Sequence, residues 1–238
     1  MSSSKEVVLV AGGAGVVGSG IALKFLKEGK LVIVPSRRSE ALEELKKQAV
    51  HELQQNLIAI HQTIDDQEQA AIHLKQEILE KYGHVDHVVS SLGSWWQKSY
   101  PTETSVSDYL DLLKNSLLSH FVIAQQFLTL PNLKTYTIIT GAAGERVMFG
   151  KMGLLTSAVS GLFGLIKALH KEVEEKKLSV KLNELRIAAY IKKPSEVTGS
   201  SFSNQVIGEY ISKIVKQDVG GKTYSFKHTN DVEQLTTL

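Results

Sequence analysis

Three glycines near the amino end have the spacing of a phosphate-binding turn. Gly12, Gly15 and Gly18 follow an apolar run at residues 7–10, and an apolar helical pattern begins near Val16. In such a strand–turn–helix, glycines permit the turn, let the main chain approach a phosphate and let the helix pack closely on the strand. The N–H groups at the helix start face the anion, and the helix dipole assists. The stretch predicts a dinucleotide site; the alternative is a glycine-rich turn in some other α/β protein.

Two arginines follow the second predicted strand, residues 31–34. The strand leads to Ser36, Arg37 and Arg38, and no acid is present until Glu40. In a βαβ nucleotide unit an acid at this place binds the ribose hydroxyls, whereas an arginine suits a 2′-phosphate. Guanidinium groups bind phosphate through paired hydrogen bonds. The sequence therefore favours NADP(H) over NAD(H); the alternative is that both arginines are solvated loop residues.

Two adjacent tryptophans, Trp95 and Trp96, follow the fourth predicted strand, residues 85–89. Ligands in open α/β sheets bind beyond the carboxyl ends of the strands. The two rings are therefore candidates for the apolar wall of a substrate site. The alternative, given equal weight, is that one ring packs in the core and the other ring covers it.

Composition excludes several classes of function. The chain of 238 residues is 42% hydrophobic, has a net charge of +2 and contains no cysteine. No disulfide framework or thiolate metal site is possible, and the scattered histidines predict no metal site. The charge is too small to indicate nucleic acid. We expect no membrane partner, because we find no apolar run of about 20 residues, and MSSSKE lacks a signal's apolar core. We therefore expect a cytoplasmic protein.

Apolar strand patterns and amphipathic helical patterns alternate along the whole chain. Strands are predicted at 7–10, 31–34, 56–61, 85–89, 135–140, 179–189 and 222–226. Helices are predicted from 16 and 39 onward and at 67–82, 105–130, 153–177 and 203–216. The alternation predicts an α/β fold with one Rossmann-type doubly wound parallel sheet of about seven strands and helices on both faces. We expect one NAD(P)-binding domain over 1–238, with 227–238 as a polar tail.

The fourth and fifth predicted helices carry unusually apolar surfaces. In the fourth, the spacing places Leu112, Leu117, Phe121 and Ala124 on the inward face. The fifth, residues 153–177, is apolar or small all round in its middle part, which is typical of a helix buried on more than one side. One side would cover the sheet and the other would meet a second subunit. The pattern predicts a homodimer or homotetramer through these two helices.

Over nearly its whole length the chain resembles the short-chain dehydrogenase/reductase family. The blocks that carry the resemblance are VVLVAGGAGVVGSGIA, SRR, VDHVVSSLG, KNSLLSHF, YTIITGAAG and VKLNELRI. The resemblance implies a nicotinamide dinucleotide along one edge of the sheet, and an asparagine, Asn115, that helps to hold a proton-relay water. The implied cofactor contacts are Gly12, Gly15, Val16, Val17, Gly18, Ser36, Arg37, Arg38, Thr63, Ile64, Ser91, Leu92, Gly93, Asn115 and Thr140.

The departures from the family pattern lie at the catalytic positions. The family uses a serine, a tyrosine and a lysine four residues after the tyrosine. Matching GAAG and GLIKALHKEV places the serine at Gly141 or Ala142, the tyrosine at Leu155 and the lysine at Val159. No tyrosine of this chain has a lysine four residues later. The chain is therefore an atypical member, with GxxGxxG spacing at the turn and Ser90-Ser91-Leu92-Gly93 after the fourth strand.

The missing pair leaves three functional hypotheses. In the family, the tyrosine gives a proton to the developing alkoxide, and aliphatic side chains cannot do so. The first hypothesis is an atypical NADP(H)-dependent oxidoreductase of an unknown carbonyl or alcohol, with Tyr100 or a water held by Asn115 as proton donor. The second is a non-catalytic NADP(H)-binding sensor or scaffold. The third is an enzyme without hydride transfer, whose Trp95–Trp96 pocket holds an apolar ligand.

Overall fold

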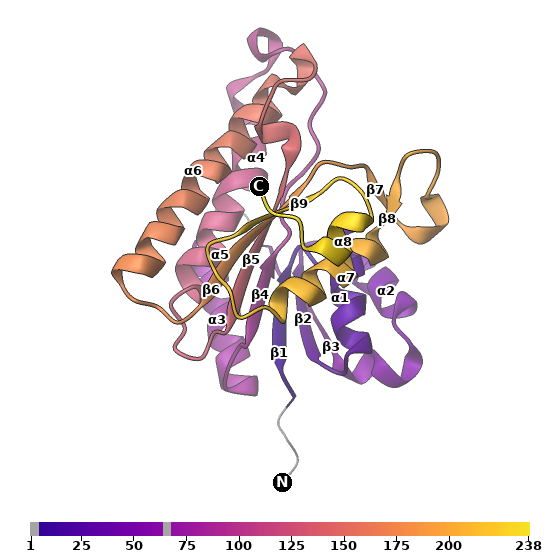
Figure 1. The fold of residues 1–238 in the computed structure, drawn as a ribbon, viewed down its shortest axis with the longest axis vertical. Helices are drawn as coiled ribbons and strands as arrows, with labels where there is room; N and C mark the ends of the chain where they lie inside the picture. The colour runs from indigo at the N-terminus through magenta and orange to yellow at the C-terminus, as the bar shows by residue number, and fades with distance from the viewer. Residues whose placement is uncertain (1–4, 64–67) are drawn as a thin grey trace.

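The computed structural model describes residues 5–63 and 68–238, and its main sheet is wholly parallel (Figure 1). Seven strands lie in the order β3-β2-β1-β4-β5-β6-β9. Parallel neighbours need crossover connections, and helices supply most of them. The strands are β1 Val7–Ala11, β2 Leu31–Ser36, β3 Leu57–His61, β4 His87–Ser90, β5 Thr135–Gly141, β6 Lys181–Ile187 and β9 Thr223–Phe226. The predicted α/β doubly wound sheet is confirmed.

Helices cover both faces of the sheet, with α1, α2 and α7 on one face and α3, α5 and α6 on the other (Figure 1). Strand β1 shows why its sequence is continuously apolar. Val8 and Val10 join the core under the first group of helices, whereas Val7 and Leu9 join the core under the second. The α-helices are α1 Val16–Lys27, α2 Ser39–Gln48, α3 Glu68–Tyr82, α4 Val106–Leu113, α5 Ser119–Phe127, α6 Gly153–Glu175, α7 Asn204–Val215 and α8 Asn230–Gln234. Short 3₁₀ turns are η1 His51–Asn56, η2 Pro101–Glu103, η4 Ala142–Gly144, η5 Gly150–Met152 and η6 Pro194–Glu196.

The order of the strands reverses between β1 and β4. From β1 the chain first builds outward through β2 to β3, and it then returns to place β4 on the other side of β1. Ala11 pairs with Ser90 at the carboxyl ends of these two strands. The two loops that follow therefore leave the sheet side by side, and such a point is where open α/β sheets bind ligands.

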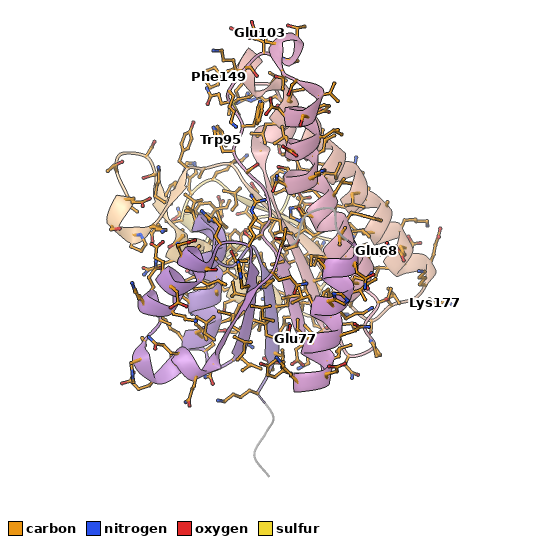
Figure 2. The ribbon with its side chains drawn as sticks, turned by 180° about the vertical axis from the view of Figure 1, so that it is seen from behind. Glu68, Glu77, Trp95, Glu103, Phe149 and Lys177 are labelled. Atoms are coloured by element: carbon orange, nitrogen blue, oxygen red, sulfur yellow. The ribbon has the colours of Figure 1, made fainter. Side chains whose placement is uncertain are left out.

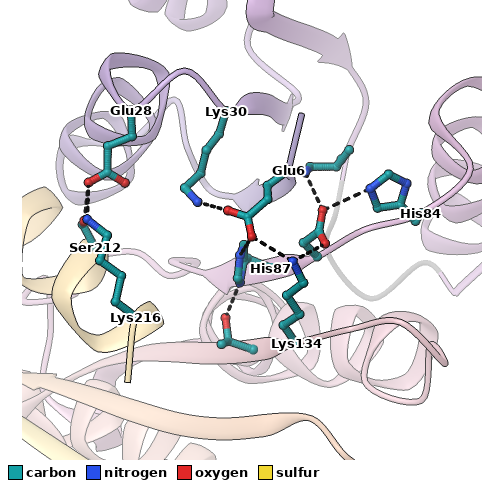
Figure 3. Close-up of polar contacts among 11 residues, drawn as sticks. Glu6, Glu28, Lys30, His84, His87, Lys134, Ser212 and Lys216 are labelled. Carbon is teal, nitrogen blue, oxygen red and sulfur yellow. Dashed lines mark hydrogen bonds and ion pairs between the residues drawn. The ribbon is translucent and has the colours of Figure 1, made fainter. Parts of the chain in front are cut away.

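A charged cluster at the opposite, amino edge of the sheet ties the strand starts together (Figure 3). Glu6 accepts hydrogen bonds from Lys30 and, at 2.8 Å, from Lys134. Asp86 accepts the Val7 N–H at 2.8 Å and pairs with Lys134 at 3.0 Å. Burial alone would raise the pKa of Glu6, but the hydrogen bonds from the two lysines outweigh it and lower the pKa to about 2. The cluster fixes the base of the sheet on the side away from the β1–β4 crevice.

The fourth predicted helix is not one continuous α-helix. A π-helical turn, η3 Lys114–Leu118, separates α4 from α5. One extra residue in a helix rotates the following face by about 100°. Phe121, which the regular spacing placed inward, is consequently 43% exposed, whereas Ser116 and His120 are buried. The expected inward position of Phe121 is therefore wrong.

Helix α6 and the turn η5 before it, Gly150–Glu175, are long and apolar enough to cross a membrane by length and composition alone, with a mean hydropathy of 1.6. Lys151 and Lys167 interrupt this segment, so it does not contain an uninterrupted apolar run of about 20 residues. The core helices of soluble proteins meet the same criteria, and α6 buries Leu162, Ile166 and Leu169 in the core between helix and sheet.

After β6 the chain forms a strap, residues 188–203, beside the carboxyl edge. Sequence patterning extended the strand to 189, but β6 ends at Ile187. Within the strap, β7 Ile191–Lys192 and β8 Phe202–Ser203 form a parallel pair. Lys193 Nζ forms an ion pair with Glu44 Oε1 of α2 at 2.5 Å. The strap is thereby joined to the helix that follows Arg38.

The last residues pack on the sheet and do not form the predicted polar tail. Helix α8 buries Val232, which is 4% exposed. Beyond it, the Ser225 N–H donates to Thr236 O at 2.8 Å, and the Leu238 N–H donates to Thr223 O at 2.9 Å. An antiparallel bridge joins Tyr224 to Thr237. The apolar side chain of Val232 and these backbone hydrogen bonds explain why the polar composition misled the prediction.

Candidate functional site

The glycine turn is held in close backbone contact with the loop after β4. Gly12 has a φ of +82°, and a β-carbon there would lie 2.1 Å from Ser91 O. A β-carbon at Gly18 would lie 2.2 Å from Gly12 O. Both values are shorter than any real contact, so these two positions admit no side chain without moving the backbone. The predicted roles of the glycines in the turn and in helix packing are matched by this geometry.

Gly15 immediately precedes helix α1, and a β-carbon there would lie 3.2 Å from Gly12 O. It is the N-cap residue, and among the described residues no side chain caps the helix start. The first turn of α1 contains no acidic residue, and its N–H groups have no partner within the helix. Gly15 lines both cavities that open at this edge. The positive end of the helix therefore faces a cleft that would suit a diphosphate.

A cleft of about 350 Å³ runs from this turn past the end of β2. Arg37 and Arg38 line it and are exposed. Ser36 Oγ accepts the Arg38 N–H at 3.1 Å, so the serine shapes the loop that presents the arginines. Other predicted contacts in the lining are Gly12, Gly15, Ser36, Ser91, Leu92, Gly93 and Asn115.

Neither of the two expected adenine contacts, Thr63 and Ile64, is found in the cleft lining of the described residues. In the described part of the chain, Gln62 lines the cleft after β3, and the neighbouring Thr63 does not. Ile64, the other expected contact, lies outside the described residues. The glutamine was missed because the family pattern pointed to the two residues after it.

A second cavity, of about 550 Å³, adjoins the cleft. The two share the wall formed by Gly15, Arg38 and residues 91–94. Val16, Val17 and Gly18 from α1 and Thr140 from β5, which are among the predicted cofactor contacts, line the second cavity. Its far wall is aliphatic, from Leu155, Val159, Leu162, Ile139 and Ile187. We call this space the apolar cavity.

The three positions that match the catalytic residues of the resembled family converge here. Gly141, Leu155 and Val159 all line the apolar cavity, and the two aliphatic side chains are 5% and 9% exposed. Ala143 of η4 joins them, in place of the alternative position Ala142. No atom of these side chains donates a proton, so the wall is chemically inert.

The two tryptophans have separate roles. Trp95 is 58% exposed and lines the apolar cavity. Trp96 is 6% exposed and packs with Leu112, Met152 and Leu155. The expectation that both rings form the wall is therefore wrong for Trp96, and the alternative of one core ring and one covering ring describes the pair. Trp95 and Phe149 are both labelled toward the same end of the molecule in Figure 2.

The two predicted catalytic residues lie in different surroundings. Tyr100 is 48% exposed, and its ring lies against Gly150 and beneath the Lys151 ammonium at 5.6 Å. Among the described residues that line the cleft and the apolar cavity, Tyr100 is absent. Asn115 lines the cleft, and its Nδ2 donates to Asp111 O of α4 at 2.6 Å, at the start of the π-helical turn. The structure therefore brings Asn115 to the site and leaves Tyr100 outside it.

A buried histidine supports the loop 91–93 from behind. His120 Nδ1 lies 2.7 Å from Ser90 Oγ, and Nε2 lies 3.0 Å from Leu92 O. A carbonyl oxygen can only accept, so Nε2 carries the proton and Nδ1 accepts the Ser90 hydroxyl. Burial lowers the pKa of His120 to about 4, and the Leu92 hydrogen bond offsets only part of this effect. His120 is neutral near pH 7 and fixes the loop between the two cavities.

Thr140 is tied to a buried ionic group. Its hydroxyl donates to Oε1 of Glu184, which is 2% exposed on β6. Arg186 binds both oxygens of Glu184, at 2.9 and 3.1 Å, and Thr223 donates to Oε2 at 3.1 Å. The guanidinium carbon also lies 3.9 Å from the centre of the Phe163 ring. The Thr140 hydroxyl proton is thus donated within the sheet.

The model of the short chain dehydrogenase family matches residues 6–189. This chain belongs to the short chain dehydrogenase family. It is 30% identical over 174 residues to the uncharacterized oxidoreductase YxjF of Bacillus subtilis, covering 68% of this chain and 63% of that protein. It is 26% identical over 129 residues to L-fucose dehydrogenase of Bos taurus, covering 54% and 45%. The chain therefore spans less than two thirds of the length of these curated relatives.

Solved short chain dehydrogenases share the fold. ElxO with NADP bound gives a TM-score of 0.79 at 20% identity, over 93% of this chain and 96% of that chain. A short-chain dehydrogenase/reductase from Serratia marcescens gives 0.79 at 17% identity with the same coverage. A metagenomic short-chain oxidoreductase in complex with NADP gives 0.74 at 17% identity, over 90% and 93%. In each case the likeness covers at least 90% of this chain.

Proposed function

We propose that this short chain dehydrogenase is an NADP(H)-dependent oxidoreductase of a small apolar carbonyl or alcohol. The observation that carries the proposal is the continuous path from the glycine turn, past Arg37 and Arg38, into the apolar cavity. The diphosphate would lie over Gly15 and the start of α1, where a positive helix end faces the cleft. The arginines would bind the 2′-phosphate. When bound, NADPH supplies hydride to a carbonyl carbon.

The chain is an atypical member of its family in this proposal. Reduction of a carbonyl also needs a proton at the oxygen, and Leu155 and Val159 cannot provide it. Tyr100 does not line the cavity in the described part of the chain, which leaves a water beside Asn115 as the non-standard donor we propose. Water is a weaker acid than the family's tyrosine, so turnover is expected to be slow.

A second candidate is an NADP(H)-binding sensor or scaffold without turnover. The aliphatic side chains of Leu155 and Val159 favour it. Mixing the protein with NADPH and a panel of aldehydes and ketones separates the candidates, with absorbance at the NADPH band as the measurement. Consumption of NADPH that requires a carbonyl supports the oxidoreductase, whereas tight binding without consumption supports the sensor.

Replacing Arg37 by alanine is expected to weaken the binding of NADPH much more than the binding of NADH. The guanidinium would lose paired hydrogen bonds to a phosphate that NADH does not have, and a loss of about 1.4 kcal/mol is tenfold in affinity. Titration of cofactor fluorescence measures both dissociation constants, so NADH serves as the matched control. Equal loss for the two cofactors would remove Arg37 from the 2′-phosphate site. Absence of NADPH binding to the wild type would contradict the proposed function.

We also propose a homodimer or homotetramer through the fourth and fifth predicted helices, now α4–α5 and α6. Exposed small residues run along α6 and would let a second copy approach closely: Ser157, Ser160, Gly161, Gly164 and Ala168. Phe121 lies exposed on α5. Phe121→Lys is expected to yield monomers by light scattering, because a buried lysine would lack a partner. Phe149→Lys, at an exposed aromatic of another region, is the control, and a monomeric wild type at micromolar concentration would contradict the proposal.

The remaining partners follow from the same site. We propose a small-molecule ligand in the apolar cavity, and neither nucleic acid nor a membrane as a partner. The cytoplasm is the location we propose for the chain. Microscopy of the full chain with a fluorescent tag would test it.

A further inference from the structure

Ser116 carries a buried hydroxyl that lacks a hydrogen-bond partner among the described residues. The residue is 4% exposed, and its Oγ is enclosed by protein. It lies in the π-helical turn η3, next to Asn115. An enclosed hydroxyl that makes no hydrogen bond opposes folding, so such groups are few and call for an explanation. Turns of π-helix are found frequently at functional sites.

The hydroxyl belongs to the apolar cavity. Ser116 lines this space together with residues 91–94 and the aliphatic wall of Leu155, Val159 and Leu162. A β-carbon on Gly93 would lie 3.9 Å from Ser116 Oγ, so the hydroxyl points toward the loop shared by the cavity and the cleft. Ser116 thus adds a buried, unpaired hydroxyl to a lining that also contains Ser91, Ser94 and Tyr190.

Other hydroxyl groups near the cavity differ from Ser116. Thr140 also lines the cavity, but its hydroxyl is bound to Glu184. Thr137 has an unpaired buried hydroxyl, but it lies within β5 and is not part of the described cavity lining. Ser116 therefore combines an unpaired hydroxyl with a place in the cavity wall.

We propose that Ser116 Oγ, after rotation about χ1 from its enclosed position into the apolar cavity, binds the oxygen of the ligand there. A serine hydroxyl donates to a carbonyl oxygen and accepts from an alcohol, so it serves both members of a carbonyl–alcohol pair. The surrounding aliphatic side chains select an apolar body, and Ser116 selects ligands that carry oxygen. The inference rests on the proposed function only in placing this ligand beside the cofactor. Ser116 is a specificity residue and not the source of the proton.

The test compares two probes that differ by one oxygen, acetophenone and ethylbenzene. Calorimetry measures their binding to the full chain, with and without NADPH. The wild type is expected to bind acetophenone about tenfold tighter than ethylbenzene, and Ser116→Ala is expected to remove most of this preference while ethylbenzene binding is unchanged. An unchanged preference in Ser116→Ala, or a wild type without preference for acetophenone, would overturn the proposal.

Thr137→Val is the matched control, because it also removes an unpaired buried hydroxyl. Both variants are expected to keep or raise the thermal midpoint of the unliganded protein, since neither breaks a hydrogen bond. Only Ser116→Ala should alter the preference between the probes; an equal effect of Thr137→Val would assign the change to the core and overturn the proposal. NADPH binding, measured before any probe is added, reports separately on the proposed function. If the protein prefers acetophenone but does not bind NADPH, the role of Ser116 is supported and the proposed dependence on NADP(H) is contradicted.

Discussion

Gly12→Ala is expected to destabilise the fold by at least about 3 kcal/mol and to abolish NADPH binding. The φ of +82° opposes any side chain, which accounts for about 1–2 kcal/mol. In addition, the new β-carbon would lie 2.1 Å from Ser91 O, so the glycine turn and the loop after β4 would have to separate. That separation would open the crevice where the diphosphate is proposed to lie. Urea unfolding and cofactor fluorescence measure the two effects.

Gly29→Ala provides a matched control for the backbone strain. Gly29 follows helix α1 with a φ of +77°, and no described atom lies within 4 Å of a β-carbon built there. Its replacement is expected to cost about 1–2 kcal/mol and to leave NADPH binding intact. Equal losses of stability for the two variants would show that the contact with Ser91 is unimportant.

The second large expected effect concerns His120. The free energy of unfolding is expected to fall in acid because this histidine binds a proton more readily in the unfolded chain. The pKa of His120 falls from 6.5 to about 4 on folding because burial disfavours the charged ring. Between these two values the unfolded chain binds a proton that the folded chain does not bind. This contribution is therefore complete above about pH 6.5 and is lost as the pH falls toward 4. Its size is about 3 kcal/mol.

Urea unfolding of the wild type and His120→Gln at pH 7 and pH 4 tests this prediction. Glutamine can still donate to Leu92 O but does not titrate. The wild type is expected to lose about 3 kcal/mol more than the variant between the two pH values. The comparison removes the contributions of His87 and His170, whose pKa values are also lowered by burial. The same loss in both proteins would contradict the titration of His120.

Much of the fold could be read from local patterns. Parallel strands buried on both faces have continuously apolar sequences, and the helices between them keep a regular amphipathic period. The glycine turn was predictable because sterics leave few alternatives at Gly12 and Gly18. Arg37 and Arg38 reached the cleft because a fixed turn follows β2.

The wrong predictions have a common cause. They depend on helix irregularities and tertiary packing, which a regular hydrophobic period does not encode. The π-helical turn rotated the inward face of the following helix. As a result Ser116 and His120 are buried, whereas Phe121 is exposed. Trp96 and Trp95 are identical in type, and only tertiary packing decides which ring enters the core. Tyr100 is near the site in sequence, but the 3₁₀ turn η2 directs the loop toward Gly150 instead.

The backbone pairing of the last residues has a consequence for solubility. Strand β9 ends one side of the sheet, and an uncovered edge strand offers a row of free amide and carbonyl groups to neighbouring molecules. Thr236 and Leu238 occupy groups of this row through Ser225 and Thr223. Residues 236–238 thus reduce the edge available for pairing with another molecule and so oppose edge-to-edge aggregation. Their polar composition did not predict this role.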